Sequence, residues 1–198
     1  MNAVATHTPG PLDWRSLLQW LRDDALISAE EASATKRRFS GANSAQHPLV
    51  RLAAANLTHT GNGKPLDIEA LTEWLALRCG LPYLRIDPLR VDVGRVTEIM
   101  SITYAERRRA LPITVGLTDV TIATCEPLDA QWVPEIEAHA RKAVKLVVVS
   151  PLELARYTTE FYTLARSVRA AIRHGESAAA ASFEQQIGRA SCRERVLW

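Results

Sequence analysis

Hydrophobic residues in the first eighty positions recur three and four apart, which is the pattern of amphipathic helices. Asp13 precedes one run of hydrophobic residues with this spacing, and Ser28 precedes another. Ser28 is also followed by Glu31, three residues later, so Asp13 and Ser28 are both expected to cap helices. A third and a fourth helix are expected around 49–55 and 68–79. Residues 12–80 are therefore predicted to form a small helical subdomain.

The pattern changes after residue 80, where short apolar runs alternate with helical stretches. The predicted order is strand, helix, hairpin, helix, strand and helix, covering residues 83–86, 93–108, 111–117 with 120–125, 130–142, 144–150 and 151–173. The last helix carries an apolar stripe that is expected to face the sheet, formed by Leu154, Tyr157, Phe161, Leu164 and Val168. The predicted fold class is α+β, with the helical subdomain followed by a compact α/β sandwich over residues 81–173.

Residues outside these two parts have the composition of terminal or connecting segments. Residues 1–11 are predicted to be disordered, and they lack the basic and apolar regions of a signal peptide. Residues 174–186 are predicted to form a linker, which implies a further domain beyond it. The strongest apolar run, at 144–150, is far too short to span a bilayer, so no direct membrane insertion is predicted.

The last stretch, residues 187–198, reads IGRASCRERVLW and allows two interpretations. The codons ATC GGA AGA GCG TCG TGT AGG GAA AGA GTG would encode IGRASCRERV, and this string resembles a common short-read sequencing adapter. The tail is therefore predicted to be non-native and, like an added tag, no part of the fold. The alternative is a native arm, in which Cys192 and the three arginines meet an anionic partner.

The charge balance depends on this tail. The sequence holds 24 Lys+Arg against 22 Asp+Glu, a formal net charge of +2. Because the tail contains three Arg and one Glu, the remainder carries 21 of each sign and no net charge. Neither nucleic acid nor an acidic membrane is therefore predicted as a partner. Cys79 and Cys125 lie in apolar segments without paired spacing, which is typical of reduced cytoplasmic thiols and not of a disulfide or a zinc site.

Motifs that carry chemistry are sparse. The loop GNGKP at 61–65 lacks two features of a P-loop, because Thr58 replaces the upstream glycine and Pro65 replaces the magnesium-binding hydroxyl. Glu126 and Asp129 are interpreted as caps of the following helix. No histidine has a partner at metal-ligand spacing among His7, His47, His59, His139 and His174. No catalytic, cofactor-binding or metal residue is predicted, and the chain is expected not to be an enzyme.

Four short passages occur in the order found in one known domain: LPY at 81–83, IDP at 86–88, RRRALP at 107–112 and EPLD at 126–129. In this order they resemble the N-terminal domain of type II secretion and type IV pilus assembly ATPases, the general secretion pathway protein E family. The resemblance implies a chain truncated before its ATPase core. ATP and magnesium are then expected only in that missing core.

The resemblance also implies a function. In this family the domain is not catalytic, and it couples the motor to the inner-membrane platform by protein–protein interaction. The implied partners are the cytoplasmic domain of a platform protein and the chain's own ATPase core, and the implied location is cytoplasmic, peripheral to the inner membrane through that partner. Solvated helix faces are the favoured interpretation of five arginines, and docking to an acidic partner surface is the alternative: Arg107, Arg108, Arg166, Arg169 and Arg173.

Some relatives bind cyclic di-GMP through a repeated helical motif with RLG and a later Leu-x-x-Gly turn. This sequence contains no RLG, and Ala25 and Asn56 stand where the two turns would have glycine. Asparagine tolerates the left-handed conformation, whereas alanine adopts it only at a cost. Cyclic di-GMP is therefore not expected to bind. A sensing domain and a stand-alone adaptor remain the alternative functions.

Overall fold

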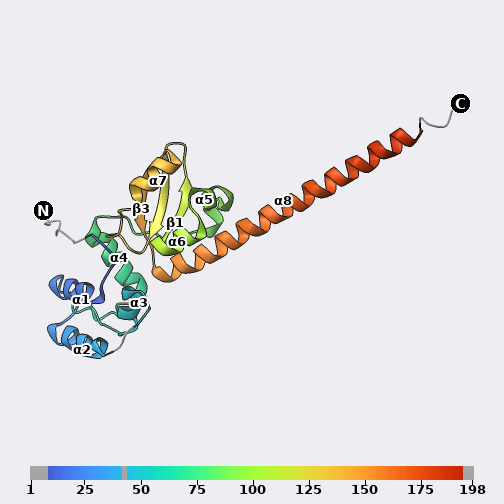
Figure 1. The fold of residues 1–198 in the computed structure, drawn as a ribbon. Helices are drawn as coiled ribbons and strands as arrows, with labels where there is room; N and C mark the ends of the chain where they lie inside the picture. The colour runs from blue at the N-terminus through green and yellow to red at the C-terminus, as the bar shows by residue number, and fades with distance from the viewer. Residues whose placement is uncertain (1–8, 42–43, 194–198) are drawn as a thin grey trace.

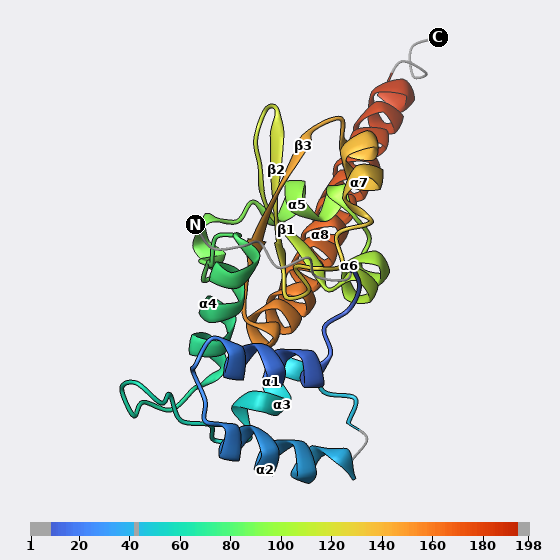
Figure 2. The same ribbon diagram turned by 90° about the vertical axis from the view of Figure 1, so that its left-hand side faces the viewer.

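The computed structural model describes the backbone of residues 9–41 and 44–193, and the side chains of residues 9–41 and 44–172. A helical part is followed by a part with a three-stranded sheet. Figures 1 and 2 show the two parts packed side by side, and the last helix, α8, extends far from both. The predicted α+β fold class, with its helical subdomain first, is confirmed. The expected disordered N-terminus lies mostly outside the described residues.

The helical part begins and ends its helices where the sequence indicates. The helices are α1 (Trp14–Asp23), α2 (Ala29–Ser40), α3 (Pro48–Ala53) and α4 (Ile68–Cys79). Asp13 caps α1, and Ser28 forms a capping box with Glu31 at the start of α2. Asp67 accepts a hydrogen bond from the backbone N–H of Ala70 at the start of α4. Gly80 ends α4 at φ 67°, a conformation that favours glycine.

The sheet has the order β1-β2-β3. β1 (Ala110–Val115) pairs antiparallel with β2 (Asp119–Thr124), which confirms the predicted hairpin, and β2 pairs parallel with β3 (Ala143–Val148). α7 (Val133–Ala140) connects β2 to β3. β1 is an edge strand, and its register shifts between Pro112 and Thr114. This shift is a bulge that bends the strand.

Two predicted elements differ in the structure. Residues 83–86 form no strand of their own, because only Tyr83 bridges to Val148 at the edge of β3. The helix expected over 93–108 is two helices, α5 (Val93–Ile99) and α6 (Ile102–Arg108), preceded by a short 3-10 helix, η1 (Pro88–Arg90).

The break between α5 and α6 has a physical cause. Met100 is extended, and its carbonyl accepts a hydrogen bond from the hydroxyl of Tyr162 on α8 at 2.7 Å. The hydroxyl of Ser101 then accepts from the backbone N–H of Tyr104 and starts a new helix. A contact from the last helix thus competes with helix continuation at this point.

The last helix is longer than predicted. α8 (Pro151–Arg193) does not end near residue 173, so the predicted linker at 174–186 and the suspect tail as far as Arg193 have helical backbone. The alanines at 178–181 favour helix and no proline interrupts it. The linking role of 174–186 stays a prediction, and residues 194–198 lie outside the described part of the chain.

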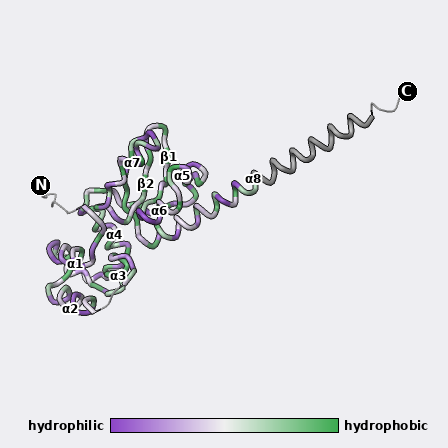
Figure 3. The backbone as a smooth tube through the Cα atoms, viewed as in Figure 1, coloured by the Kyte–Doolittle hydropathy of each residue, from purple (hydrophilic) through white to green (hydrophobic). Residues whose placement is uncertain are grey.

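Each part has its own apolar core. In the first, the fully buried leucines of α1, α3 and α4 are Leu17, Leu21, Leu49, Leu52, Leu71 and Leu75. The second core lies between the sheet and the helices α5, α6 and α8. Figure 3 shows hydrophilic positions on the outer helices α1 and α2. The predicted α8 stripe is correct for Leu154, Tyr157 and Phe161, which are buried, and wrong for Leu164 and Val168, which are about half exposed.

Ala25 and Asn56 occupy matching turns, one after α1 and one after α3. Both have φ of 56°, so Ala25 adopts the left-handed conformation that its side chain disfavours. The turn is held because the N–H of Leu26 donates to the carbonyl of Leu21 at 2.9 Å, and Ile27 is buried beyond it. The strain is therefore local to the Ala25 backbone.

Ala25→Gly is expected to raise the free energy of unfolding by about 0.5–1 kcal/mol, because glycine removes the left-handed strain but adds freedom to the unfolded chain. Asn56→Gly is the matched control and is expected to change it less, since asparagine tolerates this conformation. Urea unfolding of both variants measures the difference. An equal or lower stability of Ala25→Gly would contradict strain at this turn.

Candidate functional site

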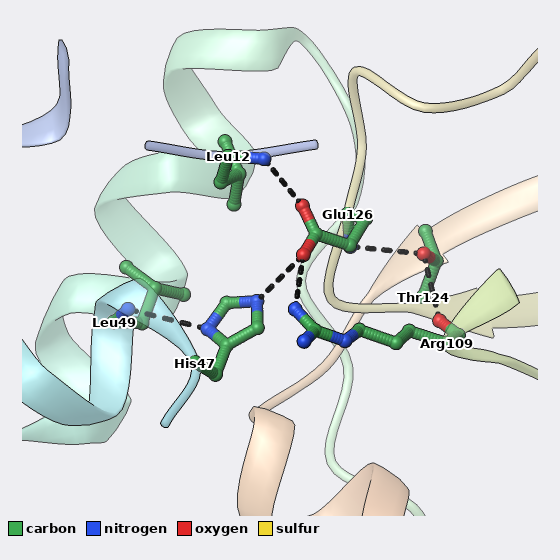
Figure 4. Close-up of polar contacts among 6 residues, drawn as sticks. All are labelled: Leu12, His47, Leu49, Arg109, Thr124 and Glu126. Atoms are coloured by element: carbon green, nitrogen blue, oxygen red, sulfur yellow. Dashed lines mark hydrogen bonds and ion pairs between the residues drawn. The ribbon is translucent and has the colours of Figure 1, made fainter. Parts of the chain in front are cut away.

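A buried carboxylate lies where the two parts of the chain meet. Glu126 follows β2 and is only 4% exposed. Its Oε2 accepts from the backbone N–H of Leu12 at 2.7 Å, and its Oε1 accepts from Nη1 of Arg109 at 2.5 Å (Figure 4). Leu12 belongs to the segment that enters α1, whereas Arg109 ends α6. One side chain therefore holds backbone from the helical part and a cation from the α/β part.

His47 adds a second link from the helical part. Its Nδ1 accepts from the backbone N–H of Leu49 at 3.2 Å and so caps α3, which requires the proton to be on Nε2. That Nε2 lies 3.3 Å from Oε1 of Glu126, without the geometry of a hydrogen bond. Both side chains are buried. The contact is electrostatic, and it places the start of α3 against the loop after β2.

Thr124 links the backbone of Arg109 to the backbone of Glu126. Its hydroxyl donates to the carbonyl of Arg109 at 3.0 Å and accepts from the backbone N–H of Glu126 at 3.0 Å. Arg109 itself is left-handed, at φ 48°, where α6 passes directly into β1. The network thus spans the end of α6, the end of β2 and the entry to α1 and α3. We call Leu12, His47, Arg109 and Glu126 the junction cluster.

The junction cluster keeps Glu126 charged. Burial by itself raises the pKa of this carboxyl, but the contacts from His47 and from the N–H of Leu12, together with the charge of Arg109, outweigh burial, and the pKa is lowered. Burial raises the pKa of the neighbouring Cys125 thiol to about 12 and that of Cys79 to about 11, so both are neutral thiols at physiological pH. The cluster joins parts of the fold and offers no activated nucleophile.

The predicted capping role of Glu126 and Asp129 is wrong. The N-cap of α7 is Trp132, which makes no side-chain capping bond, and the carboxylate of Glu126 is engaged in the junction cluster. The sequence predicts no partner for His47, and the structure gives it two, the nearby N–H of Leu49 and the carboxylate of Glu126. The contact with Glu126 has no local sequence signal, because the two residues are far apart in the chain.

The candidate docking arginines form two separate groups. Arg107 and Arg108 lie at the end of α6, with guanidinium carbons 5.5 and 5.7 Å from the ring centroid of Tyr104. Arg166 and Arg169 lie on α8 and line a groove of about 520 Å³ beside the turn between α5 and α6. The side chain of Arg173 lies outside the described residues.

The described part of the chain offers few other sites. No group of three or more histidine, cysteine or acidic side chains there is placed to hold a metal ion. Within the same residues, no helix has the length and apolar character needed to cross a membrane.

The fold therefore defines an α+β module in which a helical bundle is locked to a small mixed sheet. Residues 79–168 match the model of the MshEN domain. The chain is similar to this domain over these residues, and the resemblance to the N-terminal domain of type II secretion and type IV pilus assembly ATPases is confirmed. The match covers this domain and not an ATPase core.

Three relatives are similar to the chain. It is 40% identical over 126 residues to the type IV pilus assembly ATPase TfpB of Acinetobacter baylyi, covering 62% of this chain and 21% of that protein. The solved structure of MshE with cdg has a TM-score of 0.53 at 16% identity, over 74% of this chain and 98% of that chain, which shows a shared fold. The N-terminal domain of XpsE has a TM-score of 0.47 at 12% identity, over 76% and 96%.

Glu126→Gln is expected to lower the free energy of unfolding by about 2–3 kcal/mol, because the neutral amide cannot satisfy the buried donors of the junction cluster. Arg109 is 43% exposed and can turn to water, which keeps the loss below that of a fully buried ion pair. Glu98→Gln, on an exposed glutamate, is the control and is expected to stay within about 0.5 kcal/mol. Equal effects of the two changes in urea unfolding would contradict a structural role for the cluster.

Proposed function

We propose that this chain is the docking module of a secretion or pilus assembly ATPase, and that it couples the motor to the inner-membrane platform by protein–protein interaction. The observation that carries the proposal is the match to the MshEN domain at residues 79–168, together with 40% identity to a type IV pilus assembly ATPase. The chain spans 21% of the length of that relative. The partners are the cytoplasmic domain of a platform protein and an ATPase core.

The structure offers a mechanical basis for such coupling. The junction cluster ties the helical part to the sheet, so a force applied to one is passed to the other through buried contacts. α8 packs on the sheet with its first turns and then runs outward as continuous helical backbone (Figure 1). A helix is stiffer than a loop and can carry a displacement over its length. The module and its last helix therefore suit transmission of movement.

The location follows from the proposed partner. An assembly ATPase works where ATP is available, so we place this module in the cytoplasm, held at the inner membrane only through the platform protein. ATP and magnesium would act in the ATPase core, since the sequence of this chain contains no P-loop. No nucleic acid takes part in this scheme.

The proposal predicts saturable binding between this chain and the purified cytoplasmic domain of the cognate platform protein, with the Kd in the micromolar range or below, about 8 kcal/mol or more of binding free energy. Isothermal titration calorimetry measures it. The cytoplasmic domain of an unrelated membrane protein is the control. Absence of binding to the cognate domain, with both proteins folded by circular dichroism, would overturn the docking function.

A second candidate function is the sensing of cyclic di-GMP. It is favoured by one observation: Ala25 and Asn56 hold the same left-handed turn, at φ 56°, in matching positions after α1 and α3. Both turns therefore have the left-handed backbone conformation that glycine adopts easily, although the Cβ of Ala25 adds bulk. The shared fold with MshE, whose solved structure contains cdg, agrees with this candidate.

If cyclic di-GMP binds, a concentration one hundred times its Kd is expected to raise the free energy of unfolding by about 2.7 kcal/mol, because the ligand stabilises only the folded state. Thermal unfolding with increasing cyclic di-GMP measures this, with GMP as the control ligand. The docking proposal expects no shift with either nucleotide. A shift specific to cyclic di-GMP would establish the sensing function.

A further inference from the structure

A groove lies between α8 and the turn that joins α5 to α6. It has a volume of about 520 Å³, and the end of α7 also borders it. The residues that α8 contributes are three and four apart and therefore share one face of that helix: Tyr162, Ala165, Arg166 and Arg169. None of the four residues of the junction cluster lines this groove. Its side chains can therefore have a role other than joining the two parts of the chain.

The floor of the groove is apolar and held in shape by a buried hydrogen bond. Met100 is extended between the two helices, and its carbonyl accepts from the hydroxyl of Tyr162 at 2.7 Å. Both of these side chains are buried. Ile99 and Ile102 are partly buried against the same core and also line the groove. A surface that is already ordered loses little conformational entropy when a partner binds to it.

Cationic side chains outnumber acidic ones around this floor. The ionisable residues that line the groove are Arg166 and Arg169 from α8, His139 from α7 and Glu98 from α5. Arg169 is oriented, because its Nη2 donates to Oγ1 of Thr97 at 3.2 Å. Arg166 is exposed, and among the residues that the structure describes no carboxylate forms an ion pair with it. The groove is therefore basic.

Two other arginines of the α/β part show the contrast. Arg156, also on α8, pairs with Glu160 at 2.7 Å, and Arg109 pairs with Glu126 at 2.5 Å. Their charges are met within the chain, whereas Arg166 lines a groove with its guanidinium available to a partner. Arginines beside a well-packed apolar surface are common among the residues that dominate the affinity of protein interfaces.

We infer that this groove binds an acidic segment of the platform protein, in which aspartate or glutamate pairs with Arg166 and a neighbouring apolar side chain lies on Ile99 and Ile102. The inference rests on the proposed docking function, and it adds the docking surface and the chemistry of the partner. A carboxylate fits because a guanidinium offers it two parallel N–H donors. The apolar floor excludes water from one side of this ion pair, which strengthens the attraction. Glu98 repels an acidic segment and so limits the affinity.

The test uses the full chain and, as the probe, the purified cytoplasmic domain of the cognate platform protein, with the Kd measured by isothermal titration calorimetry. Arg166→Gln is expected to raise the Kd by about tenfold, and Arg166→Glu by more, because reversal replaces attraction with repulsion. Both losses are expected to shrink at high salt, which screens the charges. Arg156→Gln is the matched control on the same helix. Its side chain is 67% exposed and does not line the groove, so the Kd is expected to stay within about twofold.

A second variant is expected to strengthen binding. Glu98→Gln should lower the Kd by about threefold, because it removes the carboxylate that repels an acidic segment. A gain of affinity does not arise from a damaged fold, so this variant separates a docking role from a structural one. Circular dichroism and the Tm verify that each variant folds. An unchanged or higher Kd for Glu98→Gln would contradict an acidic partner.

Nuclear magnetic resonance locates the surface without any substitution. In the isotope-labelled chain, the methyl signals of Ile99 and Ile102 are expected to move when the platform domain is added. The methyl signals of Leu89 and Leu117, which are 94% and 92% exposed and do not line the groove, are expected to stay in place. Movement of the leucine signals alone would place the docking surface elsewhere and overturn the inference.

The outcomes separate the inference from the function on which it rests. Equal affinity of the unaltered chain and of Arg166→Glu for the platform domain would overturn the groove and leave the docking function standing. Concentration-dependent dimers of this chain that Arg166→Glu abolishes would assign the groove to a second copy and overturn the partner segment. No binding by the unaltered chain, with both proteins folded, would overturn the docking function and the inference with it.

Discussion

The buried charge of Glu126 is the constraint on which the arrangement of the two parts depends. A carboxylate that is 4% exposed has to be satisfied by donors, and its donors come from the entry to α1 and the end of α6. The imidazole of His47, at the start of α3, lies beside it at 3.3 Å. Sliding the helical part against the sheet would separate these groups and leave the charge buried without partners. Apolar packing alone tolerates small shifts, so the charge fixes the orientation of the two parts.

Local patterns predicted most of the fold. Caps such as Asp13, Ser28 and Asp67 mark helix starts because a side-chain oxygen satisfies nearby N–H groups, and this depends only on adjacent sequence. The hairpin was predictable for the same reason. The break at Met100 was not, since it depends on Tyr162, which lies on another helix. The length of α8 was missed because an alanine-rich segment with polar residues has the composition of a linker and the propensity of a helix.

The candidate site was hardly predictable from sequence. Glu126 stands in EPLD, which resembles the start of a helix, and its true partners are distant in the chain. In the sequence the five candidate arginines share only their charge and their place on predicted helices. In the structure Arg166 and Arg169 border a groove, whereas Arg107 and Arg108 pack near Tyr104. Both distinctions depend on contacts between segments that are distant in the sequence. The family resemblance, by contrast, depends on the order of short passages in the sequence. It does not depend on the contacts of Glu126 or on the positions of the arginines.

The bulge in β1 has a consequence for how copies of this module can be brought together. β1 is an edge strand of the sheet, and an open edge with regular N–H and C=O groups would invite another strand to pair with it. Here residues 110–113 are buried, and α5 and α6 pack against β1. Pro112 has no N–H to offer, and the register shift between Pro112 and Thr114 bends the strand away from a straight template. Modules crowded at high local concentration are therefore expected to resist joining sheet to sheet, because this edge is covered by helices and is irregular as well.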